Sequence, residues 1–236
     1  MYLNKYYKDS IYTYIKNADQ REVVEYKYSD LGYYMLKEVL ETTYQKPLAT
    51  ILDEEFYQYL GVNRTTYLPL LKFDTKEIIP TEKDTYYRNQ LLHGNVHDMG
   101  AAMLGGVAGH AGLFSNANDL AIIMQMLLNE GYYGGQQFFS PSTVRLFTTR
   151  HTECSRRGIG FDMKELNDNR SQNMCTQASD NTFGHLGFTG TCAWADPDNN
   201  LVFIFLTNRT YPSMRRNKWS GEDFRPRIQS IIYDAL

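Results

Sequence analysis

One pattern near the end of the chain constrains the fold more than any other feature of this sequence. Two runs of apolar and β-forming residues, at 191–195 and 201–206, flank a short stretch of turn residues at 196–200. Proline presets φ for a turn, and aspartate and asparagine tolerate the tight or left-handed positions that a turn requires. The second run is apolar at every position, which is typical of a strand covered on both faces. We therefore predict a β-hairpin whose second strand lies in the middle of a sheet, with helices packed on either side.

Helical periodicity dominates the first two thirds of the chain. Helices are predicted where apolar residues recur with helical spacing or where helix start signals occur. The predicted helices cover 5–17, 31–43, 47–61, 96–104, 116–130 and 224–232, and one more begins at Ser140-Pro141. A further strand is predicted over 158–163, and 167–180 is predicted to be a polar loop. Helices first, antiparallel strands next and one last helix predict an α+β fold. We expect one domain, with 1–150 as a mostly helical lobe and 151–236 as the sheet portion with its terminal helix.

The early segments carry more detailed expectations. The helix over 31–43 is expected to be capped by Ser29 or Asp30. Its inward face is expected to consist of Leu31, Met35, Leu36, Val39 and Leu40, and that of the first helix of Tyr7, Ile11, Tyr14 and Ile15. Residues 62–95 show no clear periodicity and contain two prolines, so they are predicted to form a long surface excursion. Loops of that length are uncommon unless they shape a site.

Charge and composition exclude several classes of partner. A net charge of −3 and a pI near 6.0 give no electrostatic basis for binding nucleic acid or an anionic membrane. No apolar run is long enough to span a bilayer, and the first residues are too polar for a signal peptide. The three cysteines, Cys154, Cys175 and Cys192, lack the spacing of metal ligands and do not indicate the cellular compartment.

Two weaker patterns invite a cofactor or a metal. The glycine-dense loop at 105–112 lacks the Gly-Lys-Ser/Thr sequence that completes a phosphate-binding loop. His93 and His97 are four residues apart, with Asp98 and His110 nearby, but Gly94 weakens a helix there and no glutamate follows His93. We therefore predict neither a cofactor nor a metal ion, and expect these histidines to be partly buried and hydrogen-bonded.

Three motifs gain meaning from their order. Tyr28-Ser29-Asp30 opens a helix, AGHAGLFSNANDL occupies 108–120, and His185-Leu186-Gly187 precedes the last hairpin. Taken singly, the tyrosine is most simply a packing residue and the aspartate a helix cap. Together they resemble the serine β-lactamase and penicillin-binding-protein superfamily, specifically its class C-like branch of β-lactamase-related serine hydrolases and esterases. The resemblance covers essentially the whole chain.

The resemblance implies an active-site cleft where three motifs meet. In that family Ser-x-x-Lys supplies the nucleophile, Tyr-x-Asn a phenol that moves protons, and Lys-Thr-Gly or His-x-Gly the opposite wall. By position, Tyr28 and His185 match the catalytic groups, and Asp30, Gly187 and Phe188 match the substrate-binding ones. The Phe188 N–H matches the oxyanion-hole donor of the strand, a backbone dipole aimed at developing negative charge. A small-molecule or peptidoglycan-like acyl compound is the implied substrate, and the periplasm or cell envelope the implied location of the parent protein.

The sequence departs from the family pattern in two ways. Asp30 stands in place of the usual asparagine, and an ionised carboxylate cannot donate a hydrogen bond. No Ser-x-x-Lys occurs anywhere, and the threonine versions at Thr13 and Thr43 lie in the helices that flank the tyrosine motif. We therefore expect the C-terminal part of a serine hydrolase, with the N-terminal part of the fold missing and this chain inactive.

Other interpretations stay open. A non-catalytic derivative could bind peptidoglycan-like or acyl ligands in the inherited cleft, and a structural or interaction domain would need no small-molecule site. A missing segment would leave an apolar face and a strand edge uncovered, so a homo-oligomer through that face is also expected.

Overall fold

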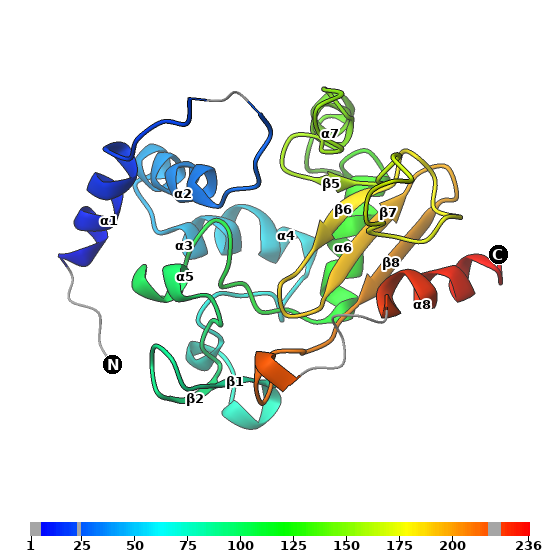
Figure 1. Cartoon of the computed structure of the whole chain (residues 1–236). Coiled ribbons are helices and arrows are strands. Elements are labelled where there is room, and N and C mark those ends of the chain that lie inside the picture. The colour runs from blue at the N-terminus through cyan, green and yellow to red at the C-terminus, as the bar shows by residue number, and fades with distance from the viewer. Residues whose placement is uncertain (1–5, 23–24, 217–222) are drawn as a thin grey trace. The chain divides into compact units, whose positions relative to one another are not determined.

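The computed structural model describes residues 6–22, 25–216 and 223–236 (Figure 1). These residues form two compact units. The first consists of the described residues within Met1–Tyr59, Asn63–Ser115 and Tyr211–Met214, and the second of those within Leu60–Val62, Asn116–Thr210 and Arg215–Leu236. Among the described residues no helix is both long and apolar enough to span a membrane.

Short helices and one hairpin build the first unit. The helices are α1 (Tyr7–Lys16), α2 (Leu31–Tyr44), α3 (Leu48–Leu52), a π-helical turn (Asp53–Tyr57), α4 (Gln58–Leu60, which ends in the second unit) and α5 (Met99–Met103), with 3-10 turns at Pro69–Leu71 and Thr75–Glu77. The helices predicted over 5–17, 31–43, 47–61 and 96–104 are therefore confirmed, the last of them shorter than expected.

The predicted inward faces of α1 and α2 are largely wrong. In α2, Leu36 and Val39 are 56% and 57% exposed, and Leu31 and Leu40 are exposed as well. The buried residue is Lys37, 4% exposed, whose ammonium lies 2.6 Å from the Glu41 carboxylate. The same carboxylate pairs with Lys8 of α1 and accepts a hydrogen bond from the Leu48 N–H at the start of α3. This shared carboxylate, rather than the apolar stripe, determines which face of α2 is covered.

A similar difference occurs in α1, where Tyr12 is the buried ring. Tyr14, expected inside, is 78% exposed, and Tyr7 is exposed too, whereas Ile11 and Ile15 are half-buried. The Tyr12 hydroxyl donates a hydrogen bond to the Tyr34 carbonyl of α2, so contact with α2 selects this face of α1.

Residues 62–95, predicted to form a long surface excursion without clear periodicity, contain more regular structure than expected. They contain the antiparallel hairpin of β1 (Pro80–Asp84) and β2 (Gln90–His93), and Leu92 within it is fully buried. Asp84 closes the hairpin, because its carboxylate accepts hydrogen bonds from the N–H groups of Tyr86, Tyr87 and Arg88. Carboxylate turns of this kind leave no mark in hydrophobic periodicity.

A four-stranded antiparallel sheet forms the centre of the second unit. Its order is β5 (Asp162–Met163), β6 (Phe183–Leu186), β7 (Cys192–Asp196) and β8 (Leu201–Phe205). The helices are α6 (Ala117–Leu128), α7 (Pro141–Thr148) and α8 (Phe224–Tyr233), and a small hairpin joins β3 (Tyr132–Tyr133) to β4 (Gln136–Gln137). A 3-10 turn, Met214–Arg216, completes the described elements. The strand predicted over 158–163 is reduced to β5, and the helices predicted at 116–130, after Ser140 and near the C-terminus are confirmed.

Helices cover both faces of this sheet (Figure 1). On one face Met124 of α6 packs with Ala195 and Val202; on the other, Ile228 and Tyr233 of α8 pack against a core that includes Trp194. The predicted hairpin and the covering helices are confirmed. The predicted central position is wrong for the described residues, because β8 is the last strand in the order and pairs with β7 alone. Two covered faces suffice to make a strand continuously apolar, whether or not both of its edges are paired.

Candidate functional site

Strand β6 requires glycine at two positions beside the candidate histidine. A Cβ on Gly187 would lie 2.0 Å from the Thr191 hydroxyl oxygen, and one on Gly184, where φ is +156°, would lie 1.9 Å from the Ala193 carbonyl oxygen. His185 lies opposite Ala193 in the β6–β7 ladder. The Thr191 hydroxyl and the Ala193 carbonyl therefore approach the chain closely on either side of His185, which restricts the position of its Cα.

Two contacts fix the imidazole of His185. Its Nδ1 lies 2.7 Å from the Leu186 carbonyl oxygen, and its Nε2 lies 2.8 Å from Nη1 of Arg157. A guanidinium can only donate, so Nε2 accepts and the ring proton resides on Nδ1, where it is donated to the carbonyl. In this arrangement the Nε2 lone pair is directed at Arg157.

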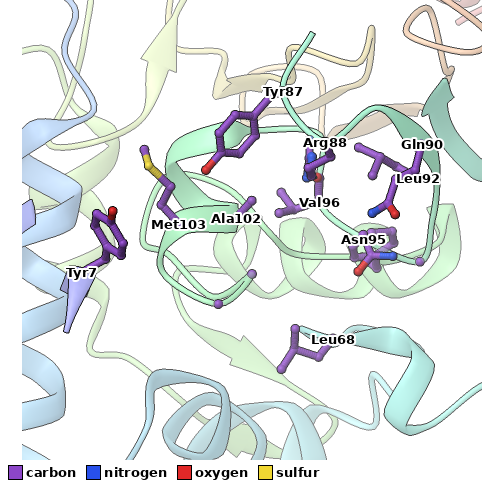
Figure 2. A pocket seen from close by; sticks show the side chains of 14 residues that line it. Tyr7, Leu68, Tyr87, Arg88, Gln90, Leu92, Asn95, Val96, Ala102 and Met103 are labelled. Carbon is purple, nitrogen blue, oxygen red and sulfur yellow. The ribbon is translucent and has the colours of Figure 1, made fainter. Parts of the chain in front are cut away.

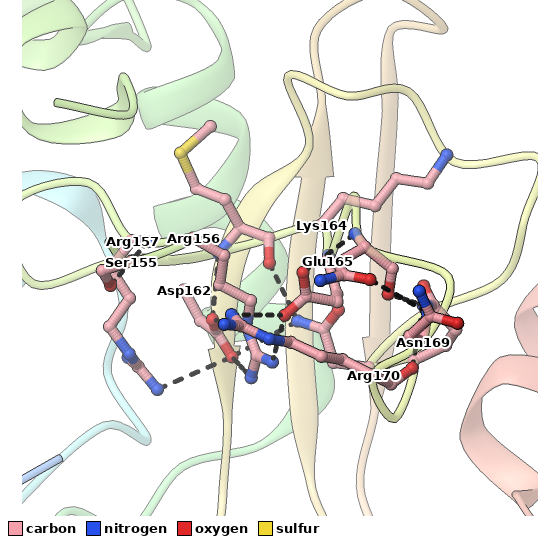
Figure 3. Close-up of polar contacts among 12 residues, drawn as sticks. Ser155, Arg156, Arg157, Asp162, Lys164, Glu165, Asn169 and Arg170 are labelled. Atoms are coloured by element: carbon pink, nitrogen blue, oxygen red, sulfur yellow. Dashed lines mark hydrogen bonds and ion pairs between the residues drawn. The ribbon is translucent and has the colours of Figure 1, made fainter. Parts of the chain in front are cut away.

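Arg157 belongs to a buried ionic network (Figure 3). Asp162 of β5, 1% exposed, accepts two hydrogen bonds from Arg156, at 2.6 and 3.0 Å, and its Oδ2 lies 3.7 Å from Nη2 of Arg157. The hydrogen bond to Asp162 is the main reason that the pKa of Arg156 is raised. Glu165 lies 3.6 Å from Arg156, and the Asn173 amide donates to Asp162 at 3.3 Å. Burying Asp162 is tolerable because these cations and donors satisfy it.

Sequence reasoning missed this network. The sequence feature that could have indicated the network is a pair of adjacent arginines, five and six residues before an aspartate that an apolar residue follows. The contact with His185 could not be found in that way, because 28 residues separate Arg157 from it.

The turn after β6 is tied to a second arginine. The Arg209 Nε donates to the Phe188 carbonyl, and its guanidinium carbon lies 4.6 Å from the centre of the Phe188 ring, which is 55% exposed. The Arg209 N–H also donates to the Thr189 carbonyl at 2.9 Å. These contacts fix the two peptides that follow Phe188. The role of the Phe188 N–H as an oxyanion donor stays a prediction.

Tyr28-Ser29-Asp30 lies in the first unit, directly before α2. The Ser29 hydroxyl accepts a hydrogen bond from the Leu31 N–H at 3.2 Å, whereas Asp30 makes no side-chain cap. Of the two expected caps the structure therefore shows Ser29. Tyr28 is 56% exposed. Because Tyr28 and Asp30 belong to the first unit and His185, Gly187 and Phe188 to the second, their convergence on one cleft stays a prediction.

His110 of the glycine-dense loop pairs with Asp98, which lies directly before α5. Nε2 of His110 lies 2.9 Å from the Asp98 carboxylate, which also caps α5 by accepting from the Ala101 N–H at 2.7 Å. The hydrogen bond from His110, more than any other influence, lowers the pKa of Asp98. The His110 ring stacks on Tyr34 of α2 with centroids 4.5 Å apart, a contact that sequence reasoning did not foresee.

The histidines considered for a metal site have separate partners. Nε2 of His93 contacts the Ile78 carbonyl, and Nδ1 of His97 lies 2.9 Å from Glu82, whereas His110 contacts Asp98. Across the described ranges 6–22, 25–216 and 223–236 no cluster of three or more potential ligands occurs.

Comparison with known proteins extends over most of the chain. A protein of Escherichia coli, provisionally named a D-alanyl-D-alanine carboxypeptidase, is 38% identical over 196 residues, which cover 78% of this chain and 45% of that protein. This chain therefore spans less than half the length of that relative. Among solved structures, a β-lactamase from Mycobacterium bovis matches with a TM-score of 0.62 at 19% identity, covering 92% of this chain and 66% of the other. A penicillin-binding-protein homologue from Caulobacter crescentus matches with a TM-score of 0.53 at 20% identity, covering 76% and 51%.

The solved structures establish the fold, a β-lactamase/transpeptidase-like arrangement of helices with an antiparallel sheet. The family is established by sequence, since the Beta-lactamase family profile matches residues 5–224. That range contains Tyr28, Asp30, His185, Gly187 and Phe188. The chain belongs to the Beta-lactamase family, among the serine β-lactamases and penicillin-binding proteins.

Proposed function

We propose that this chain provides the tyrosine and histidine walls of a serine-acylation site that hydrolyses an ester, an amide or a β-lactam. The observation that carries the proposal is the family match over residues 5–224, which includes both candidate catalytic residues. The name of the Escherichia coli relative supports a peptidoglycan-like acyl substrate, and small-molecule acyl donors are the wider class. One fold in this superfamily serves many acyl donors, so the substrate is left at that level.

The proposed chemistry divides acyl transfer into two steps. A serine oxygen forms a bond to the substrate carbonyl carbon, the bond to the leaving group breaks, and water later releases the acyl group. Tyr28 would pass the serine proton to the leaving group, and the Phe188 N–H would donate to the oxygen of the tetrahedral intermediate. His185, held between Arg157 and the Leu186 carbonyl, would line the opposite wall of the site.

This chain alone is proposed to be inert. A phenol has a pKa near 10 and needs a neighbouring cation to act as a base at neutral pH. In the family that cation is the lysine of Ser-x-x-Lys, a motif that the 236 residues do not contain. Without the serine no acyl-enzyme can form.

Covalent labelling tests this proposal. The chain is incubated with a fluorophosphonate, a p-nitrophenyl ester and a chromogenic cephalosporin, and the intact mass is recorded. No stoichiometric adduct and no turnover above buffer are expected. A longer chain from the same gene that includes a Ser-x-x-Lys motif is expected to be labelled at that serine. Labelling of the present chain at a threonine, lost in Tyr28→Phe, would contradict the proposal.

A non-catalytic binding protein is the second candidate. Asp30 favours it, because an ionised carboxylate cannot donate a hydrogen bond to a substrate carbonyl as the family's asparagine can. If the longer chain also fails to be labelled but binds an acyl-D-alanyl-D-alanine peptide in calorimetry, this second function replaces the first.

A further inference from the structure

The first unit contains a cavity that none of the family motifs explains. Its volume is about 540 Å³, within the range of small-molecule sites. Residues from the β1–β2 hairpin and the segment around α5 form most of its lining, with Leu68, Phe114 and Tyr7 completing it (Figure 2). All of the lining residues belong to the first unit.

The walls of this cavity are mostly apolar. The apolar and aromatic lining residues are Tyr7, Leu68, Tyr87, Leu92, Val96, Ala102, Met103 and Phe114. Leu92 is fully buried and Val96 nearly so, which makes the base of the cavity part of the core. Gly105 and Gly106 have φ of +81° and +90° and present bare backbone to it. A ligand with a flat or branched hydrocarbon body would bury apolar area against these walls.

Among the described lining residues the charged one is Arg88, and its charge is already paired. Its Nε donates to Asp84 at 3.0 Å, and its Nη1 and Nη2 donate to the carbonyls of Val96 and His97, each at 2.6 Å. Glu82 lies 3.7 Å away, and the Arg88 side chain is only 7% exposed. An anionic ligand would find a guanidinium whose three nitrogens all have partners already.

Asp84 is held ionised in this arrangement. Burial alone would raise its pKa, but hydrogen bonds from the N–H groups of Tyr87, Tyr86 and Arg88 and from the Arg88 side chain hold that pKa well below its ordinary value. Its charge therefore persists at neutral pH and stays paired with Arg88. The remaining polar side chains of the lining, apart from the tyrosine hydroxyls, are the neutral amides of Gln90 and Asn95.

We propose that this cavity binds an uncharged small molecule with an aryl or branched alkyl body and an amide or hydroxyl group at one edge. The apolar walls take the body, and the Gln90 and Asn95 amides pair with the polar edge. The proposal does not depend on the proposed acyl transfer, because none of the lining residues is a proposed catalytic or substrate-binding residue and the experiment measures binding.

Matched probes test the charge requirement. Phenylacetamide and phenylacetate share the same body and differ in the charge at the edge, so each is titrated into the chain and followed by protein NMR. Phenylacetamide is expected to bind with a Kd of about 1–10 mM, as a fragment of this size would. Phenylacetate is expected to bind at least roughly tenfold more weakly, because its carboxylate would lose solvation without gaining a free cation.

Matched variants test the location. Ala102→Phe places a ring inside the cavity, and Met103→Phe fills it from the neighbouring position. Both are expected to abolish phenylacetamide binding. Ala117→Phe makes the same change at an exposed position in the second unit and is expected to leave binding unchanged. Thermal unfolding identifies any variant that has lost the fold, and phenylacetamide binding is compared among the variants that keep it.

Three results would overturn the proposal. These are equal affinity for the two probes, unchanged phenylacetamide binding in a folded cavity-filling variant, and no phenylacetamide binding up to tens of millimolar. None of them bears on covalent labelling, so the cavity and the proposed catalysis fail separately.

Discussion

Helices α2 and α6 look alike in sequence and are used differently. Both carry apolar residues at helical spacing, and both are predicted from that pattern. In α6, Met126 is fully buried and Met124 packs against the sheet, whereas in α2 Leu36 and Val39 are more than half exposed. The difference shows that periodicity identifies a helix, but the partner decides which face is covered.

The partner of α6 is an extended surface, the β7–β8 part of the sheet. The partners of α2 include two short helices, which meet it at Glu41 through Lys8 and the Leu48 N–H. An ion pair and a hydrogen bond thus orient α2, and Glu41 supplies the partner that the buried ammonium of Lys37 requires.

The largest expected effect is on stability and tests this comparison directly. Met126→Ala removes a fully buried side chain and should lower the free energy of unfolding by about 2–5 kcal/mol. Leu36→Ala, at an exposed position of α2, should change it by no more than about 0.5 kcal/mol. Urea unfolding followed by circular dichroism measures both. Equal losses would mean that α2 has a covering partner in solution.

Much of the fold could be predicted, for reasons visible in particular residues. The Asp196–Asn200 turn, the Asn116 cap of α6 and the Ser140 cap of α7 are local signals, and each element lies where its signal predicted. Local chemistry did not settle the inward face of α2 or the edge position of β8, because both depend on residues distant in the chain.

The candidate site was predictable only as a list of residues. His185, Gly187 and Phe188 were identified by their motif, and the Thr191 hydroxyl lies where a side chain at residue 187 would begin. The pairing of His185 with Arg157 and the Asp84 turn that holds Arg88 were not predictable. Both depend on side-chain hydrogen bonds, which leave no periodic trace in a sequence.

Acid should affect the sheet hairpin measurably. Burial alone would raise the pKa of Asp196, but hydrogen bonds from Ser179, Tyr233 and Asn199 lower it to about 2. A carboxyl whose folded pKa is depressed stabilises the fold above its unfolded pKa, near 4, and loses that contribution as the pH falls through the folded value. The expected loss is about 2 kcal/mol between about pH 4 and pH 2.

Urea unfolding at several pH values measures this loss, with Asp196→Asn as the comparison variant. The variant should be less stable at neutral pH and should show a smaller slope with pH in the acid range. Asp98 in the first unit also has a lowered pKa, but its side chain is 39% exposed, so solvent screening should leave it a smaller acid effect. An unchanged slope in Asp196→Asn would show that other carboxyls dominate acid unfolding.

The smallest expected effect concerns association rather than folding. Leu36, Val39 and Leu40 form an exposed apolar stripe on α2, and exposed apolar patches promote association. We expect copies of this chain to self-associate through that stripe, and the double variant Leu36→Lys/Val39→Glu to weaken the association by about tenfold, or about 1.4 kcal/mol.

Sedimentation velocity over a range of concentrations measures the change. Leu146→Lys, a charge placed at an exposed leucine of α7, serves as the matched control and should leave it unaltered. Because these positions are exposed, the variants should unfold within about 0.5 kcal/mol of the parent chain, so altered association cannot be attributed to lost stability. A monomer at every concentration would show that the open face of α2 attracts no second copy. Association that persists in the double variant would instead direct attention to β8, whose outer edge has no paired strand among the described residues.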